Sequence, residues 1–364
     1  FAVTGGQLGK ISNTFYLVGG HRFDGLYNPM GGPTFTQTYT NQIRKFSIKN
    51  SGSVLSFSEF TSITDPLHLR RRDYNLIPQI FPDGAEGYTI SSGAFQLNAD
   101  LPFLYPVDIK ESGYWPVTEF NQFLSNYHSA KACLFDSVAN NMHTLFFGGM
   151  SQYYYQDGNL IQDDQVPFVK TISRLTRHAD GTLQEYQLPT EMPGLQGASA
   201  EFIPNELHPH YDSEILKLNQ ITQDTILIGH IYGGIVSPTL NPFMNNVTGT
   251  TSADPNIYRV TLIRETPEDV WQINGANPFD FNVYPNPATS EIVLDFSMDR
   301  QSDIYYFITG IDGRIIQEGE MSSAQQSVRN SYNIKLSEDI ASQVLILTVV
   351  VDNKYYLIKK ILKN

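Results

Sequence analysis

The chain has 364 residues, 41% hydrophobic and 12% aromatic, so it can bury a sizeable core and exceeds the length of one average domain. Its formal net charge of −13 argues against nucleic acid or an anionic membrane surface as a partner, because like charges repel. Only 17% of the residues are charged, whereas Gly (27), Tyr (21) and Phe (22) are plentiful. This composition is typical of short strands joined by turns and predicts an all-β protein, with two domains as the first expectation.

The sequence carries no recognisable membrane span or signal peptide. Its longest apolar run, VLILTVVV at residues 344–351, is far shorter than the ~20 residues that a spanning helix needs. We therefore expect no membrane span, and we expect Phe1 to be a processed or truncated start. The single cysteine, Cys133, lies in the apolar stretch AKACLF and is expected to be a core residue rather than a reactive thiol.

The first three quarters of the chain contain a repeat at long, uneven spacing. An apolar strand that ends in small residues recurs as TFYLVGG (14–20), GYTISSG (87–93), TLFFGG (144–149) and TILIGH (225–230). Each is preceded by one strand-like run and followed by two more, the last of which is EDVWQI at 268–273. Four units of four strands predict a β-propeller over residues 1–272, and a fifth unit before Phe1 is left open.

The glycines at the end of the second strand suit the crowded centre of such a fold, since Gly permits close backbone approach and positive φ. With Gly19-Gly20 and Gly148-Gly149 in that position, the region resembles the Kelch-type propeller family. The other two units depart from the motif, with Ser92-Gly93 and Gly229-His230.

A Gly/Asn/Pro-rich linker is predicted at 273–282, and a second domain at 283–364. The new domain opens on NVYPNPATSEIVLDF, where Pro285 and Pro287 fix φ and remove two backbone donors. This segment must form an edge or a turn rather than a central strand. About seven short alternating runs follow, which predict a small β-sandwich of immunoglobulin-like type.

This second domain resembles the C-terminal sorting domain of the type IX secretion system of the Bacteroidetes. The resemblance rests on the segments YPNP, IDGRII, NIKLSEDIASQVLILTVVVDNK and KKILKN, although SQVLIL stands where the family usually has Gly-x-Tyr. It implies export through the periplasm to the medium or the outer cell surface, with the type IX machinery as partner. The motif residues are Tyr284, Pro285, Asn286, Pro287, Asp312, Gly313, Lys359 and Lys360. A plain adhesive module, with lysines that protect a strand edge, is the alternative.

Strand direction predicts which propeller loops share a face. Loops between the second and third strands, and between successive units, should meet at one mouth, together with the long loop 231–255. Arginine, histidine and tyrosine at such a mouth suit a small polar ligand such as a glycan. The candidate ligand-binding residues are His21, Arg22, Arg71, Arg72, Asp73, His128, Tyr153 and Tyr154. Alternatively, the arginines form structural pairs with acidic neighbours.

Enzyme motifs are largely missing from the sequence: there is no nucleophile elbow, His-Glu-x-x-His motif, phosphate-binding loop or cysteine cluster. The histidines and acids of LHPHYDSE (207–214) are interpreted as a solvated loop, so no metal or cofactor is expected. Glycosylation at Ser137 or Thr225 stays open. The sequence thus predicts an exported binding protein for a carbohydrate or surface ligand. A propeller enzyme acting on glycans, as hydrolase, lyase or oxidoreductase, is the alternative.

Overall fold

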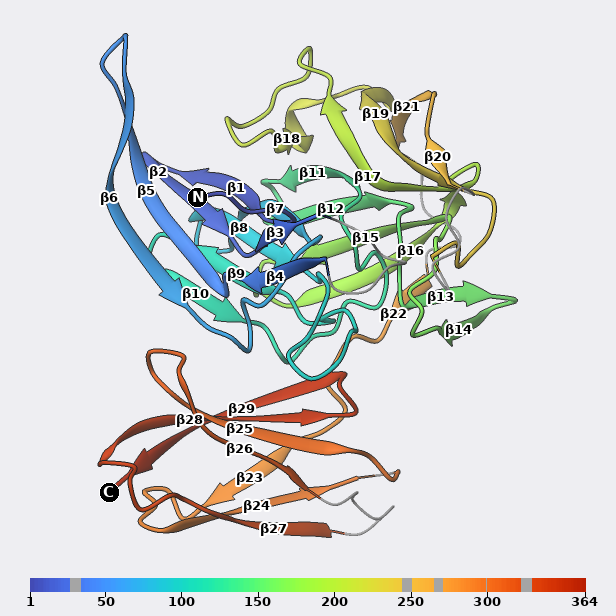
Figure 1. Ribbon diagram of the computed structural model, residues 1–364. Coiled ribbons are helices and arrows are strands. Elements are labelled where there is room, and N and C mark those ends of the chain that lie inside the picture. Colours follow the sequence, from blue (N-terminus) through green and yellow to red (C-terminus); the bar gives the residue numbers. More distant parts are fainter. Residues whose placement is uncertain (27–33, 244–250, 265–270, 299, 322–328) are drawn as a thin grey trace.

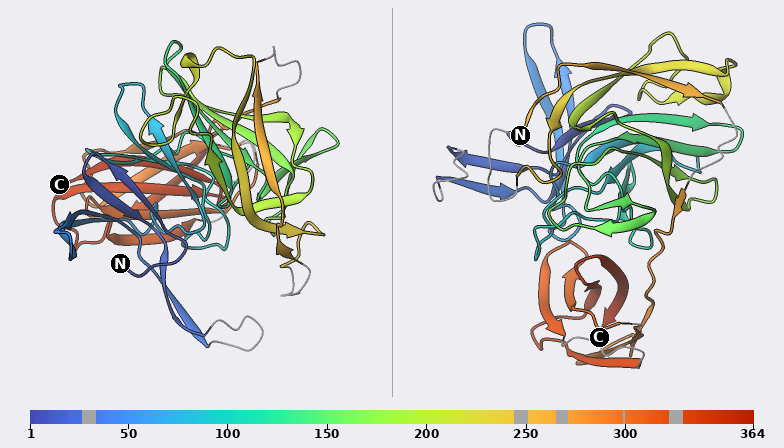
Figure 2. Two further views of the ribbon diagram at one scale, coloured as in Figure 1. Left: turned by 90° about the horizontal axis from the view of Figure 1, so that it is seen from above. Right: turned by 90° about the vertical axis from the view of Figure 1, so that its right-hand side faces the viewer.

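The computed structural model describes residues 1–26, 34–243, 251–264, 271–298, 300–321 and 329–364. In these ranges the chain forms strands and a single 3₁₀ turn, η1 (Leu218–Gln220), which confirms the predicted all-β fold. Figure 1 shows a larger N-terminal part above a smaller C-terminal part, with the connecting segment running along one side in the right-hand view of Figure 2.

The first two sheets of the N-terminal part are four-stranded antiparallel meanders. Sheet 1 contains β1 (Gln7–Ile11), β2 (Thr14–Val18), β5 (Gln42–Asn50) and β6 (Leu55–Thr64) in that order. Sheet 2 contains β7 (Asn75–Ile80), β8 (Glu86–Ser91), β9 (Val107–Lys110) and β10 (Gly113–Pro116). Both follow the strand order expected for the first two repeat units.

Sheet 3 repeats this four-stranded pattern, whereas sheet 4 repeats it only in part. Sheet 3 contains β11 (Ala130–Asp136), β12 (Asn141–Phe147), β15 (Thr171–Arg177) and β16 (Leu183–Glu191), with β18 (Leu216–Lys217) beside β11. Sheet 4 contains β17 (Leu195–Pro204), β19 (Thr225–Ser237), β20 (Ser252–Ala253) and β21 (Ile257–Ile263). It departs from the pattern because β20 and β21 both pair with β19.

The glycines at the end of the second strand hold successive sheets together. The amide of Gly20 donates to the carbonyl of Arg71 at 2.8 Å, and that of Gly149 donates to Gln196 at 2.8 Å. A Cβ on Gly19 would lie 2.6 Å from the Arg71 oxygen, and one on Gly148 would lie 2.3 Å from the Gln196 oxygen. Each glycine pair therefore lets the second strand of one sheet touch the segment that leads into the next sheet.

The same contact links sheets 2 and 3, where the amide of Gly93 donates to the carbonyl of Asn126 at 3.1 Å. The first strands of successive sheets are also neighbours, since β7 contacts both β1 and β11, and β11 contacts β17. The sheets are thus arranged in sequence order around their first strands.

One predicted strand belongs to a different sheet. EDVWQI was expected to complete the fourth unit, but β22 (Trp271–Ile273) pairs with β16 at the outer edge of sheet 3, with Trp271 opposite Gln187. Residues 265–270 lie outside the described part of the chain. The apolar pattern identified a strand correctly, but a strand pattern does not specify which sheet edge accepts it.

Two hairpins project from the sheets where loops were expected. Strands β3 (His21–Gly25) and β4 (Phe35–Tyr39) pair between β2 and β5, and β13 (Tyr153–Gln156) and β14 (Asn159–Gln162) pair between β12 and β15. Each is a separate two-stranded sheet that carries its side chains away from the end of the parent sheet.

In its described residues the C-terminal part is a sandwich of seven strands in two sheets, and its first strand begins at Phe281. One sheet contains β23 (Phe281–Tyr284), β24 (Glu291–Ser297) and β27 (Arg329–Lys335). The other contains β26 (Ile315–Met321), β25 (Ile304–Gly310), β28 (Gln343–Val351) and β29 (Tyr355–Lys363). A separate apolar core lies between the two sheets, with Ile292, Leu294, Leu345 and Ile361 fully buried.

The Pro-Asn-Pro segment pairs with the edge strand β29. The side-chain amide of Asn286 donates to the carbonyl of Lys360 at 2.9 Å, and its oxygen accepts from the amide of Leu362 at 2.9 Å. Ala288 continues this contact as a parallel bridge to Lys363. The prolines themselves cannot donate, so the asparagine side chain supplies the hydrogen bonds of a short additional strand.

The C-terminal sandwich packs against the N-terminal part through the outer face of its larger sheet. We call this the docked face; it consists of Tyr305, Phe307, Val350 and Tyr356, which join the apolar cluster of sheets 1 and 2. The ring of Tyr356 lies 4.6 Å from that of Tyr105, and its hydroxyl donates to Gln96 Oε1 at 2.9 Å. The predicted linker is therefore not the only connection between the two parts, because this apolar cluster contains residues of both.

The turn between β28 and β29 adds a polar part to this contact. The side-chain amide of Gln96 donates to the carbonyl of Asn353 at 2.8 Å. The Lys354 ammonium lies 4.8 Å from the ring of Phe123 and 4.6 Å from that of Tyr153. Burial among these rings lowers the pKa of Lys354 to about 8, with a further contribution from Arg300.

We predict that deletion of residues 283–364 destabilises the N-terminal part, because it exposes the Phe103 and Tyr105 side of the shared cluster to water. The melting temperature should fall by roughly 5 °C or more, and the truncated chain should bind a hydrophobic dye. The control is the full chain cleaved at a protease site inserted after Pro278, where both parts are present. Equal melting temperatures for the truncated and cleaved proteins would contradict a stabilising contact.

Candidate functional site

The structure brings four of the eight candidate residues together where sheets 1, 2 and 3 meet. Arg72 Nη1 lies 3.4 Å from His21 Nε2, and Arg72 Nε lies 3.3 Å from Asp73 Oδ2. The amide of His128 donates to the carbonyl of Asp73 at 2.7 Å. We call this set, His21, Arg72, Asp73 and His128, the mouth cluster.

Partners inside the protein already occupy the charged groups of the mouth cluster. The Arg72 guanidinium stacks 4.3 Å from the Phe95 ring, and His128 Nε2 lies 3.1 Å from Glu201 Oε1. Burial, reinforced by Arg72, lowers the pKa of His21. Burial also raises the pKa of Asp73, against the opposite effect of Arg72 and His128. Most charged groups of the cluster therefore have a partner inside the protein, although His21 Nδ1 and Arg72 Nε are buried without a hydrogen bond among the described residues.

Arg71 lies beneath the mouth cluster and is fully buried, with 0% of its surface exposed. Its guanidinium donates to the carbonyls of His68, Ser92 and Tyr105 at 2.8–2.9 Å and stacks on the rings of Phe103 and Tyr105. Burial lowers its pKa, which nearby Tyr105 partly opposes. The structural alternative is thus favoured for Arg71, although its partners are carbonyl groups and not the expected acids.

The other candidate residues lie elsewhere. Arg22 is on the outer side of β3, where it pairs with Asp24 at 2.6 Å and is 69% exposed, because side chains alternate along a strand. Tyr153 is buried against Phe123, and its hydroxyl donates to Gln162 Oε1 on the facing strand. Tyr154 lies beside it on β13, opposite Ile161. The hairpin moves both tyrosines away from the mouth. Part of the long loop 231–255 lies outside the described residues.

A groove of about 1190 Å³ lies among the turns that face away from the mouth cluster. It is lined by the turn after β1 and by the β7–β8, β9–β10 and β15–β16 turns. Trp115 of β10 also lines it. These turns come from sheets 1, 2 and 3, so the groove is formed only when the sheets assemble. We call it the lower groove.

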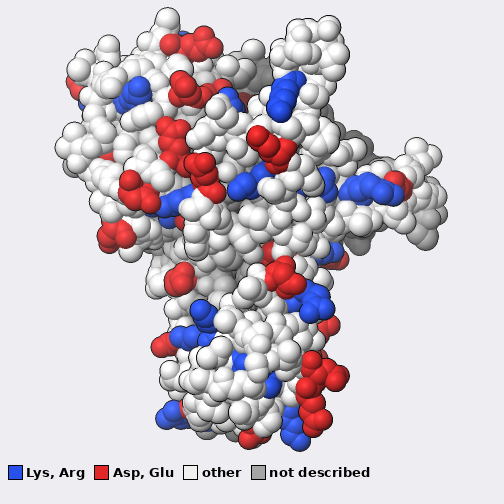
Figure 3. Space-filling view, turned by 90° about the vertical axis from the view of Figure 1, so that its left-hand side faces the viewer, with Lys and Arg blue, Asp and Glu red and all other residues white. Residues whose placement is uncertain are grey.

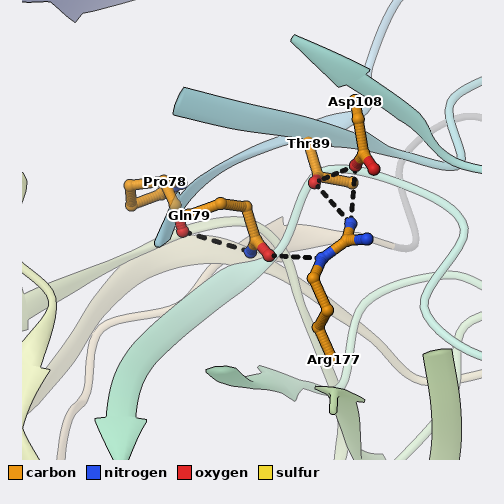
Figure 4. A network of polar contacts seen from close by, with 5 residues as sticks. All are labelled: Pro78, Gln79, Thr89, Asp108 and Arg177. Carbon is orange, nitrogen blue, oxygen red and sulfur yellow. Dashed lines mark hydrogen bonds and ion pairs between the residues drawn. The ribbon is translucent and has the colours of Figure 1, made fainter. Parts of the chain in front are cut away.

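A buried ion pair anchors the lower groove between sheets 2 and 3 (Figure 4). Arg177 Nη2 donates to Asp108 Oδ1 at 2.6 Å, and Thr89 donates to the same oxygen at 2.6 Å. Gln79 Oε1 accepts from Arg177 Nε at 3.3 Å. Burial raises the pKa of Asp108, while Arg177 and Thr89 lower it. The pair fixes the two sheets relative to each other.

Trp115 stands on the same face of sheet 2 as this ion pair, because it lies directly opposite Asp108 in the β9–β10 register. Trp115 is 45% exposed, although tryptophan is usually well covered. Lys110 lies 4.4 Å above the Phe81 ring and pairs with Asp83 at 2.8 Å. An exposed indole next to fixed polar groups can stack on the apolar face of a sugar ring.

The lower groove was not predicted from the sequence. Its lining residues lie in four turns and the adjoining strand ends, which are far apart in the chain. The one available signal was a tryptophan in a short strand bounded by a glycine and a proline.

Among the described residues, three carboxyl groups have raised pKa values, a property that would favour an enzyme if two faced a common cavity. Asp73 and Asp108 belong to the two regions described above. Burial raises the pKa of Glu185 to about 8, although the amides of Phe123 and Leu124 donate to it and oppose the shift. Glu185 is fully buried, so it is placed to affect stability rather than to contact a substrate.

Over the face of the molecule shown in Figure 3, acidic and basic side chains are interspersed on both parts. No extended basic patch is visible on that face, in keeping with the net charge of −13. In the described part of the chain no helix has the length and apolar character that crossing a membrane requires.

Residues 282–364 match the family model described as "Secretion system C-terminal sorting domain". This match confirms the predicted type IX sorting domain, and with it export of the protein to the cell surface or the medium by the type IX machinery. The division of the rest of the chain into a domain at 1–272 and a linker at 273–282 stays a prediction.

No curated protein matches the chain. Among solved structures, dimeric latent PorU from Porphyromonas gingivalis matches at 11% identity over 97% of this chain, with a TM-score of 0.21. This chain spans 30% of PorU. An exo-β-1,3-galactanase from Phanerochaete chrysosporium with bound β-1,3-galactotriose matches at 10% identity and a TM-score of 0.27, over 100% of this chain and 96% of the enzyme. Similarities this low carry no inference about activity.

We predict that Arg71→Met lowers the free energy of unfolding by at least about 3 kcal/mol, because three buried carbonyl groups lose their donor. Arg72→Met is the matched control. Arg72 is partly exposed in the mouth cluster, so its loss should be about 1 kcal/mol or less. Urea denaturation measures both variants. Equal losses would show that Arg71 is no more structural than its neighbour.

Glu185 should make stability depend on pH. Because its pKa is about 8 in the folded state and about 4.3 in an unfolded chain, the folded state binds the proton more tightly. This contribution is complete below about pH 4 and is lost as the pH rises through about 8.

We therefore expect the free energy of unfolding to fall between pH 5 and pH 8, by up to about 1.4 kcal/mol per pH unit from this group. Glu185→Gln should flatten the dependence. Glu191→Gln, on the same strand at an exposed position, should leave it unchanged. Urea denaturation at pH 5, 6.5 and 8 tests this, and an unchanged slope in Glu185→Gln would refute it.

Proposed function

We propose that the N-terminal part is the binding portion of an exported protein and recognises a carbohydrate or another surface ligand in the lower groove. The observation that carries this proposal is the exposed Trp115 in a groove of about 1190 Å³ whose walls come from three sheets. Such a groove is large enough for a chain of several sugar rings.

The arrangement of polar groups around Trp115 supports a preformed site. Lys110 and Arg177 each have an acidic partner and an aromatic neighbour, Phe81, so their positions are fixed before a ligand arrives. Preorganised donors and acceptors reduce the entropy cost of binding. In this proposal the mouth cluster is a structural network at the opposite end of the sheets.

We also propose that the four sheets form a Kelch-like propeller. Two features support this: the hydrogen bond from the end of each second strand to the segment leading into the next sheet, and the contacts between successive first strands. A propeller gathers its turns at two opposite ends, and the lower groove would lie at one of them.

We predict that Trp115→Ala weakens binding to a polysaccharide by about tenfold or more, because the stacking surface is lost. Wild type and variant are compared by affinity electrophoresis in gels containing soluble β-glucan, galactan or mannan. The melting temperature should barely change, since Trp115 is half exposed. Tyr232→Ala, an exposed aromatic residue on sheet 4, is the matched control and should bind normally.

Equal retardation of Trp115→Ala and wild type, or no retardation of the wild type in any gel, would refute carbohydrate binding at this groove. Release of reducing or unsaturated sugars from these polysaccharides by the wild-type protein would instead favour the enzyme alternative.

A further inference from the structure

The charged residues that line the lower groove fall into two groups. Asp83 and Asp108 are paired with Lys110 and Arg177, at 2.8 Å and 2.6 Å between the charged atoms. In these pairs the charges largely cancel at the distance of a ligand. Lys110 and Arg177 therefore attract an anionic ligand only weakly.

The second group consists of Glu86 and Glu111. Both side chains are exposed, and both line the groove, one at the start of β8 and the other in the β9–β10 turn. Neither belongs to an ion pair among the described residues. Glu111 has one cation nearby, since Lys45 Nζ donates to its main-chain carbonyl at 3.5 Å. Among the described residues that line the groove, however, only Glu86 and Glu111 are charged without an ion-pair partner.

Trp115 does not distinguish a neutral sugar from an acidic one. An indole ring stacks on the apolar C–H face of a pyranose whether the sugar is neutral or carries a carboxylate at C6. A negative charge on the sugar, however, would enter the field of Glu86 and Glu111, while the two cations that line the groove are already paired with aspartates. Selection by charge then depends on these two glutamates.

We infer that Glu86 and Glu111 make the lower groove selective for uncharged saccharide chains and exclude acidic ones. This inference rests on the proposed function. It adds the class of saccharide and names the residues that reject the other class.

The experiment uses the full chain and matched pairs of polysaccharides, namely soluble β-glucan, galactan and mannan, each in its native form and after oxidation at C6 to the uronate. Affinities are measured by biolayer interferometry on the immobilised polysaccharides at 20 mM and 500 mM NaCl. We expect the native form to bind about tenfold more tightly than the oxidised form at low salt. At high salt this ratio should shrink, because exposed charges are screened.

The double variant Glu86→Gln/Glu111→Gln should bind the oxidised polysaccharide several-fold more tightly, so that the ratio of native to oxidised affinity falls towards one. The matched control is Glu206→Gln/Glu320→Gln, which changes the net charge equally at exposed positions outside the groove lining. If the control gains as much as the double variant, overall charge and not the groove is responsible, and the inference fails.

Equal or tighter binding of the oxidised form by the wild type would also overturn the inference, while binding abolished by Trp115→Ala would still support the proposed function. If no native or oxidised polysaccharide binds, the proposed function and this inference fail together.

Discussion

The buried guanidinium of Arg71 is the interaction on which the arrangement of the molecule depends. It fixes the carbonyls of His68, Ser92 and Tyr105, and so holds three separate segments of the chain around one cation. A charge removed from water is costly unless its donors are satisfied, so the surrounding backbone has little freedom to move. The three carbonyls and two rings replace part of the water that the cation has lost, while Arg71 Nη2 has no hydrogen-bond partner among the described residues.

Two contacts connect the surroundings of Arg71 with other parts of the protein. The carbonyl of Arg71 itself accepts from Gly20, which ties sheet 1 to the segment leading into sheet 2. The Tyr105 ring that covers the guanidinium also packs on Tyr356 of the sorting domain. A single side chain thus connects the stacking of two sheets with the docking of the C-terminal sandwich.

Much of the fold could be predicted because its signals are local. Alternating apolar runs located the strands of both parts, and the glycine pairs marked the places where Gly19 and Gly148 must approach another backbone. The docking could not be foreseen from alternation alone. However, the run VLILTVVV in β28 does not alternate, and a strand without alternation is buried on both faces.

The candidate site was predicted less well, because its residues meet only through tertiary structure. His21, Arg72, Asp73 and His128 do lie close together, each at the start of a strand or just before one. Tyr153 lies on a hairpin where a loop was expected. The lower groove draws on four turns, and no spacing in the sequence brings those turns together.

The hydrogen bonds between Asn286 and β29 bring the two ends of the sorting signal together. In the sequence the Pro-Asn-Pro motif and the terminal lysines are separated by some seventy residues, but Asn286 hydrogen-bonds on either side of Ile361, to Lys360 and Leu362. The beginning and the end of the label thus form one continuous epitope. A chain trimmed before Lys360 would leave the first motif without the strand that orders it.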